Sequence, residues 1–238
     1  MNTIRFSDER VKVIAHRGLS GLECENTCAA FVAAGNRSYY GVETDIHVTT
    51  DGEFVVFHDD NLKRMTGFDL NIENCDLKQI RSLRLRDRDG LVREDLCIPT
   101  LQEYIRICRK YDKKCVLELK NHFDRQNIIS VVEIIREMEW LENTIFISFD
   151  LENLLTIREL LPQQKAQYLV ESISDEILET IGQYRLDVDA AHYVLTPEFI
   201  TAVHACGCEV NAWTVDCLVD AARLAKMDVD YITTNIIE

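Results

Sequence analysis

Residues 41–48 read GVETDIHV, a run that is apolar enough for a buried strand and yet carries two acids. Successive side chains of a strand point to opposite faces, so Glu43 and Asp45 share one face. Thr44 and Ile46 then lie on the other face. In a barrel strand the acidic face looks into the centre, and this run therefore predicts both a strand and a site.

Short runs of this kind alternate along the chain with longer segments of helical periodicity. The alternation predicts βα units around a parallel sheet. We expect eight strands, at residues 11–15, 41–48, 114–120, 144–149, 165–170, 187–191, 208–214 and 231–233. We expect seven helices, near residues 27–34, 101–111, 127–139, 152–161, 175–184, 197–205 and 217–226, several of them opened by a capping or first-turn residue: Thr100, Asp150, Ser174, Thr196 and Asp216.

Eight strands in 238 residues predict a (β/α)8 TIM barrel. An open doubly wound sheet fits the alternation as well, but it more often carries a glycine-rich phosphate loop after its first strand, and His16-Arg17-Gly18 is not one. The long, charged interval at 59–99 breaks the rhythm, and loops of this length are usually functional or separately folded. We therefore expect one domain over residues 1–238, with a small insertion at 59–99 after the second strand.

Charge and hydropathy set limits on the partners. With 41 acidic and 26 basic residues, the net charge of -15 predicts no binding to nucleic acid or to anionic membranes. An anionic small molecule remains acceptable, because a bound divalent cation can reverse the local field. The N-terminus is polar and no apolar run is long enough to span a bilayer, so we expect a cytoplasmic protein without stable membrane insertion.

The nine cysteines are odd in number. Those at positions 108, 115 and 217 lie in strand-like or helix-like apolar stretches, which favours reduced, buried thiols over a disulfide framework. The spacings of Cys24 with Cys28 and of Cys206 with Cys208 do not complete a zinc or thioredoxin-like motif.

A second strand repeats the acidic pattern. Residues 114–120 read KCVLELK, so Glu118 and Lys120 share one face. Three carboxylates and a lysine are then expected to converge at the strand ends, and clustered like charges need a cation or protonation to offset their repulsion. Oxygen ligands select a hard ion, so Glu43, Asp45 and Glu118 predict a site for one Mg2+ or Ca2+. The alternative is that each acid pairs with a surface base.

Two histidines follow apolar runs. His16 comes after Val-Ile-Ala and His58 after Val-Val-Phe, where catalytic groups emerge in barrels, and we expect them to act as general acid and base. Arg17 offers a planar fork for a phosphate and Lys120 a point charge. Trp213 is expected either in the core or as a wall of the substrate pocket. The other four histidines are treated as bystanders.

The chain also resembles a known family. The motifs that carry the resemblance occur in order along nearly the whole chain: His16-Arg17-Gly18, Glu25-Asn26-Thr27, Glu43-Thr44-Asp45, Asp51-Gly52 before His58-Asp59, Ile98-Pro99-Thr100-Leu101, Glu118-Leu119-Lys120, Ser148-Phe149-Asp150 and Trp213-Thr214-Val215. Together they are similar to the glycerophosphodiester phosphodiesterase family, whose members split a small-molecule glycerophosphodiester into sn-glycerol 3-phosphate and an alcohol. The resemblance implies the same barrel, one divalent ion, the histidine pair, and phosphate contacts from Arg17 and Lys120.

Two alternatives to this function remain. One is a related barrel enzyme that acts on lysophospholipids or phosphatidylinositol, which the charged insertion does not favour. The other is a catalytically idle barrel that binds phosphorylated metabolites or a protein partner. The motif match departs from the family at Asn235, where aspartate is common, and the chain ends at Glu238 without room for an eighth helix. Closure of the barrel, or a homodimer contact at that end, is left open.

Overall fold

The computed structural model describes residues 2–238, and within them nine strands form one sheet. Eight of the strands are parallel and close into a barrel, because β1 pairs with β2 on one side and with β9 on the other. The (β/α)8 barrel expected from the sequence is confirmed. The barrel strands are β1 (Lys12–Ala15), β2 (Gly41–Val48), β4 (Lys114–Leu119), β5 (Thr144–Ser148), β6 (Ala166–Val170), β7 (Asp187–Ala191), β8 (Val210–Trp213) and β9 (Tyr231–Thr234).

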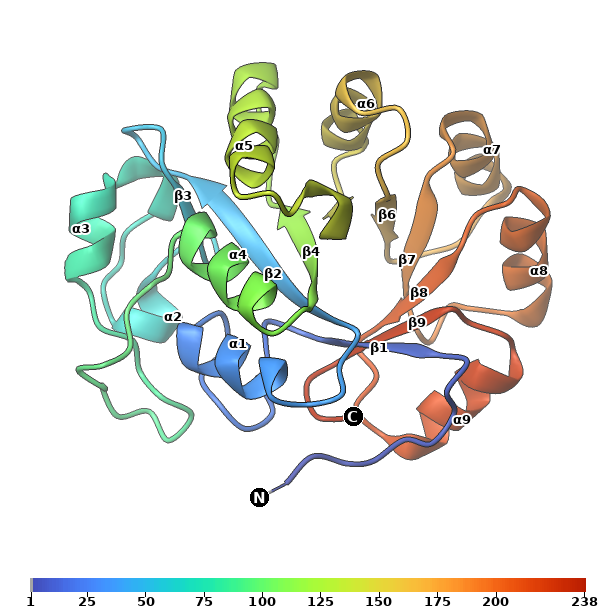
Figure 1. The fold of residues 1–238 in the computed structure, drawn as a ribbon, viewed down its shortest axis with the longest axis horizontal. Coiled ribbons are helices and arrows are strands. Elements are labelled where there is room, and N and C mark those ends of the chain that lie inside the picture. Colours follow the sequence, from blue (N-terminus) through green and yellow to red (C-terminus); the bar gives the residue numbers. More distant parts are fainter. Residues whose placement is uncertain (1) are drawn as a thin grey trace.

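Seven helices connect the barrel strands and surround them (Figure 1). They are α1 (Cys28–Gly35), α4 (Leu101–Lys110), α5 (Arg125–Glu137), α6 (Leu151–Leu160), α7 (Asp175–Tyr184), α8 (Pro197–Ala205) and α9 (Leu218–Lys226). The side chains of Thr100, Asp150, Ser174 and Thr196 cap their helices by accepting from backbone N–H groups, as expected. The prediction for Asp216 was wrong: α9 begins after Cys217, which makes no side-chain cap bond.

The core lies mainly between the strands and the helices. Leu117 and Leu119 of β4 and Ile46 of β2 point outward into it, each almost fully buried. Burial of one such side chain contributes about 1.5–3 kcal/mol, which fixes the register of these strands. The alternating residues, among them Glu43 and Glu118, must therefore point into the barrel.

The segment between β2 and α4 forms a separate lobe. The strand β3 (Phe54–Val56) turns back and pairs antiparallel with β2, and α2 (Lys63–Thr66), η1 (Ile72–Asn74) and α3 (Leu77–Ser82) follow it. Figure 1 shows these elements together at the left of the barrel. A small core of their own holds them, so the expected insertion after the second strand is present: Cys24, Val55, Phe57, Leu62, Ile72, Cys75, Ile80, Leu85, Leu96 and Ile98.

The lobe corrects one expectation. The apolar strand expected before His58 is present as β3, but it is antiparallel to β2 and belongs to the lobe rather than to the ring of parallel strands. His58 thus reaches the barrel from the end of a hairpin.

Within residues 2–238 the barrel closes without an eighth helix. All four residues of β1 pair with β9, from Lys12 with Tyr231 to Ala15 with Thr234. The N-terminal segment extends this contact, because the backbone N–H of Ile4 donates to Ile236 at 3.0 Å and that of Glu238 donates to Ile4 at 2.7 Å. One further short turn, η2 (Leu141–Asn143), precedes β5.

The cysteines are all free thiols. Five are buried as expected, but Cys206 and Cys217 are exposed, so the prediction of burial was wrong for Cys217. Cys217 lies at the surface just before α9, where its thiol donates to Asp220 Oδ2 at 3.0 Å instead of packing into the core. Among residues 2–238 no helix has the length and apolar character needed to cross a membrane.

Candidate active site

A hollow opens where the parallel strands end. Its volume is about 60 Å3, and about 10–15 Å3 admits one water molecule, so the hollow has room for a few small atoms or ions. It lies at the carboxyl ends of the strands, the face that carries catalytic groups in barrels of this type. Its walls are formed by His16, Arg17, Glu43, His58, Glu118, Lys120, Ile147, Phe149, Leu169, Asp189, Trp213 and Thr233.

Three carboxylates meet at this hollow. Glu43, Asp45 and Glu118 each offer an oxygen, and these oxygens lie within 4.8 Å of one another. The sheet register explains the convergence, since Asp45 and Glu118 are direct partners on β2 and β4 and Glu43 is two positions earlier on the same face. All three are buried. The expectation from strand periodicity that these three acids lie together therefore agrees with the structure.

Neighbouring groups hold the acids in place. Arg17, in a left-handed conformation with φ 52°, donates its backbone N–H to Glu43 Oε2 at 2.7 Å. Asn26, also left-handed at φ 54°, donates its amide to Asp45 Oδ2 at 2.7 Å. The Asn26 oxygen accepts from the Thr44 hydroxyl at 2.7 Å, which fixes the orientation of the amide. Asn26 was quoted among the family motifs, and strand periodicity alone gave no signal for this contact.

The pKa values of the acids differ because their neighbours differ. Burial and the charges of Asp45 and Glu118 raise the pKa of Glu43 well above its usual range. Burial, followed by the charge of Asp45, raises the pKa of Glu118 to about 8. Burial would also raise the pKa of Asp45, but Arg17 and Lys120 lower it to about 2. The cluster thus holds more protons at neutral pH than three ordinary carboxyl groups would.

Two cations border the acids. Lys120, directly after β4, has its Nζ 2.8 Å from Glu118 Oε1 and 3.6 Å from Asp45 Oδ1. Arg17 Nη1 donates to Glu25 at 2.9 Å, and its Nε lies 3.7 Å from Asp45 Oδ2. That buried Nε has no hydrogen-bond partner in the described part of the chain. Both side chains therefore face the hollow with donors beside the carboxylates.

The two predicted histidines line the same hollow. His16 follows β1, and its Nδ1 lies 2.8 Å from Asn235 Oδ1. His58 comes from the lobe, and its Nδ1 lies 2.8 Å from Asp59 Oδ1. Burial, and next the charge of Arg17, lowers the pKa of His16 to about 4. Burial also lowers the pKa of His58, although Asp45 and Asp59 oppose the shift.

A profile of the glycerophosphoryl diester phosphodiesterase family matches residues 16–238, which include every group described above. The chain belongs to the glycerophosphoryl diester phosphodiesterase family. The resemblance drawn from the ordered motifs is confirmed by this match.

Individual members of the family agree with it. A glycerophosphodiester phosphodiesterase from Caldanaerobacter subterraneus is 28% identical over 94% of this chain and 93% of its own. A phosphodiesterase structure from Oleispira antarctica, in complex with the product sn-glycerol-3-phosphate, is 27% identical with a TM-score of 0.86 and covers 94% of this chain and 92% of its own. A glycerophosphodiester phosphodiesterase structure from Parabacteroides distasonis is 26% identical with a TM-score of 0.82, over 96% of this chain and 94% of its own.

One wall of the hollow in this protein is apolar. Trp213, the last residue of β8, packs edge-on against Phe149 with ring centroids 5.8 Å apart. Its Nε1–H donates to the Asp189 carbonyl at 3.1 Å, and Ile147 and Leu169 complete this side. Trp213 thus packs against Phe149 and also lines the hollow. It combines the two alternatives expected for it, core packing and a wall of the pocket. Phe149 was quoted among the motifs but was not predicted to line the site.

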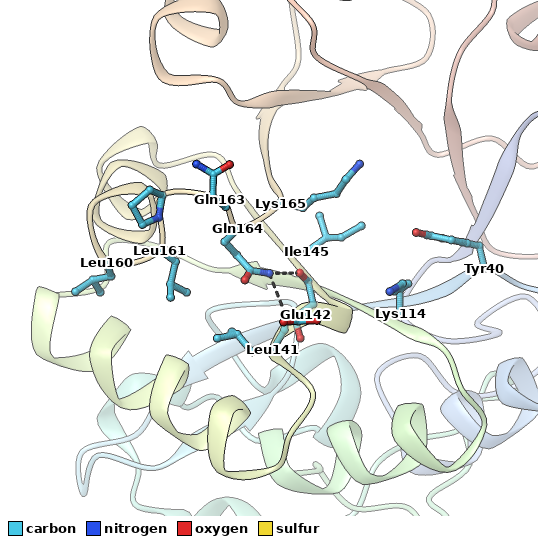
Figure 2. Close-up of a pocket in the computed structure, with 12 residues that line it drawn as sticks. Tyr40, Lys114, Leu141, Glu142, Ile145, Leu160, Leu161, Gln163, Gln164 and Lys165 are labelled. Carbon is cyan, nitrogen blue, oxygen red and sulfur yellow. Dashed lines mark hydrogen bonds between the residues drawn. The ribbon is translucent and has the colours of Figure 1, made fainter.

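A larger hollow, of about 560 Å3, lies at the opposite end of the barrel (Figure 2). Its residues stand at the amino ends of the strands, including Lys114, which opens β4, and Lys165, which precedes β6. Gln164 crosses it and donates to Leu141 and Thr144, the bonds dashed in Figure 2. Lys114 donates to Asn143, and Lys165 pairs with Glu209. This hollow has no carboxylate cluster among the described residues, so its size does not make it the candidate active site of this family member.

The remaining histidines take structural partners. His47 is buried, with its Nδ1 3.0 Å from Glu73 of the lobe, and His122 and His204 contact Asp150 and Asp230. The fourth, His192, has its Nδ1 3.4 Å from Arg223 Nη2, and none of the four lines the hollow.

Proposed function

We propose that this chain hydrolyses glycerophosphodiesters to sn-glycerol 3-phosphate and an alcohol, with one divalent cation, Mg2+ or Ca2+, held by Glu43, Asp45 and Glu118. The observation that carries the proposal is the convergence of three buried carboxylates within 4.8 Å at the catalytic face of the barrel. The family membership and the product complex of the Oleispira relative support the substrate class.

The residues present fit a cation of this kind. Two unit charges 4.8 Å apart repel by about 3.5 kcal/mol at an effective dielectric constant of 20, so three ionised carboxylates are unfavourable without a partner. All candidate ligands are oxygens, which suits Mg2+ or Ca2+ rather than zinc or copper. When bound, the cation would supply Lewis-acid polarisation of a phosphoryl oxygen and help to orient the attacking oxygen.

The other side chains at the hollow would bind the phosphate, transfer protons and contact the substrate. Arg17 and Lys120 would bind the non-bridging phosphate oxygens, because both place donors at the hollow next to the acids. His16 and His58 would act as the acid and base pair: one removes the proton of the attacking hydroxyl, either water or a glycerol hydroxyl, and the other protonates the leaving alkoxide. Trp213 would form a wall for the substrate.

Three further parts of the proposal concern the whole chain. Residues 1–238 would act as one catalytic domain, with the segment at 59–99 as an insertion at its mouth. The cytoplasmic location and the homodimer stay predictions.

The decisive experiment is an activity screen with and without chelator. Purified protein is offered glycerophosphocholine, glycerophosphoethanolamine, glycerophosphoinositol and lysophospholipids, with Mg2+ and Ca2+ compared. Cation-dependent release of glycerol 3-phosphate is expected. Release that is unaffected by chelator would contradict the cation site, and no release from any diester would contradict the activity.

One observation keeps lysophospholipids in that screen. Phe149, on the apolar wall of the hollow, is 44% exposed, so the wall continues toward solvent. A lysophospholipid, whose glycerol carries an acyl chain, has an apolar surface to contact there. Faster turnover of lysophospholipids than of glycerophosphocholine would favour this second function.

A further inference from the structure

We infer that Asp216 and Asn235 act together as positioning residues that keep the proton of neutral His16 on Nδ1, so that Nε2 is free to accept a proton in the reaction. The inference rests on the proposed function for its catalytic consequence. The position of the proton itself follows from contacts that do not depend on substrate or cation.

Asn235 is held firmly beside His16. Its Oδ1 lies 2.8 Å from His16 Nδ1. Its backbone N–H donates to Asp216 Oδ1 at 2.8 Å, and its side-chain Nδ2 donates to Asp216 Oδ2 at 2.6 Å. Its carbonyl accepts from the backbone N–H of Gly21 at 2.8 Å, and the Ser20 hydroxyl lies 2.6 Å from Oδ1. The side chain therefore has one place in the structure.

Asp216 also decides which way the Asn235 amide faces. A carboxylate only accepts hydrogen bonds, so a reversed amide would bring its oxygen against Asp216 Oδ2 at 2.6 Å, an unfavourable contact between two acceptors. The amide must therefore turn its nitrogen to Asp216 and its oxygen to His16. An oxygen at 2.8 Å from a ring nitrogen requires a proton on that nitrogen, which places the proton on Nδ1.

The tautomer determines which ring nitrogen of His16 can accept a proton. With the proton on Nδ1, the neutral ring carries its lone pair on Nε2, which has no hydrogen-bond partner among residues 2–238. The ring can then take a proton from a hydroxyl at Nε2, and Asn235 Oδ1 continues to accept from Nδ1–H in the imidazolium that forms. In the other tautomer Nε2 already holds a proton, and neutral His16 cannot act as a base from that atom.

An isosteric substitution should reverse the arrangement. In D216N the backbone N–H of Asn235 cannot turn, so the new amide must keep its oxygen toward that N–H and its NH2 group toward the Asn235 side chain. The Asn235 amide is then driven to flip and to present its own NH2 group to His16 Nδ1. The proton of neutral His16 should move to Nε2.

The test reads the tautomer and the kinetics separately. Two-bond 15N–1H correlation spectra of the neutral imidazole distinguish a proton on Nδ1 from one on Nε2. We expect Nδ1–H in the natural protein and Nε2–H in D216N. We also expect D216N to lower kcat by on the order of 100-fold or more with KM changed less than about threefold, because a wrong histidine tautomer removes base catalysis without removing binding.

Two further variants complete the design. The double variant D216N/N235D returns an acceptor oxygen to His16, because the amide introduced at position 216 can donate to the new carboxylate at position 235. It should restore both the Nδ1–H signature and at least a tenth of the natural kcat. D220N, in the first turn of α9, is the matched control and should change neither readout.

The outcomes separate this inference from the proposed function. A natural protein that carries Nε2–H, or a D216N variant that keeps Nδ1–H, overturns the inference even if the enzyme is active. A tautomer that reverses without a loss of kcat overturns the catalytic role of the pair. Absence of diester hydrolysis in the natural protein defeats the proposed function, while the spectra still test the position of the proton.

Discussion

Binding of a divalent cation to the carboxylate cluster is expected to release protons near neutral pH. The pKa of Glu118, one of the three carboxyl groups, is raised to about 8 because the side chain is buried and faces Asp45. At pH 7 this carboxyl group is therefore mostly protonated before a cation arrives. The pKa of Glu43 is raised as well, so a second proton contributes.

The size of the effect follows from these values. Ligand carboxyl groups must ionise to hold the ion, so about one to two protons leave for each cation bound at pH 7. Each released proton makes the affinity rise about tenfold per pH unit, equivalent to about 1.4 kcal/mol. Between pH 6 and pH 8 the Kd for Mg2+ or Ca2+ should fall by about 50-fold through the Glu118 proton alone. The sign is fixed, because a raised carboxyl pKa disfavours the charged form that binds the ion.

Titration calorimetry measures this release. The same titration in two buffers of different ionisation enthalpy gives the number of protons from the difference in heat. E118Q should release about one proton fewer and bind more weakly, whereas E133Q, a substitution on the exposed face of α5, is the matched control. Heats that are independent of buffer, or a Kd that is constant from pH 6 to pH 8, would refute the linkage between cation binding and the buried acids.

Three other predictions use the same site. H16A and H58A should each lower kcat by about 100-fold to 10,000-fold with the fold retained by circular dichroism, and a natural rate in either would refute the acid and base assignment. K120M should lower kcat/KM by at least about tenfold without weakening cation binding; calorimetry that shows a weaker cation affinity would instead assign Lys120 to the ion site. In EDTA the free energy of unfolding should fall as the pH rises from 4.5 to about 8, because the folded state holds the Glu118 proton that the unfolded chain releases. Urea titrations at pH 5 and pH 8 check this loss, and a slope that is unchanged in E118Q would contradict it.

Local periodicity was enough to predict the acidic cluster. Glu43, Asp45 and Glu118 could be placed on one face because side chains alternate in every strand, and burial of the opposite faces leaves the strands no other register. Helix capping was also local, and four of the five predicted caps or first-turn residues, such as Thr100, act as expected.

Two details, the position of the strand before His58 and the partners of Asp216, depend on contacts between residues distant in the sequence. The run before His58 has the composition of a barrel strand, and only the pairing of Val55 with His47 shows that it turns back as a hairpin. Asp216 has the residue type of a helix cap, but Asn235, nineteen residues further on, takes both of its oxygens. The Asp216 carboxylate makes two short hydrogen bonds to Asn235 instead of one cap bond to the first turn of α9. The sequence alone does not show that Asn235 lies within reach of Asp216.

The two sides of the hollow come from different parts of the chain. The histidine pair, Arg17, Lys120 and the carboxylate cluster all precede residue 121. Phe149 lies in the loop after β5, Leu169 in β6 and Trp213 in β8. Substitutions at Phe149, Leu169 and Trp213 can therefore alter the apolar side of the hollow while the charged side, together with Asp216 and Asn235 beside His16, stays unchanged. A hybrid barrel that joins residues 1–120 of this chain to the second half of a relative, with Asp216 and Asn235 retained to position His16, is expected to change selectivity and keep the reaction.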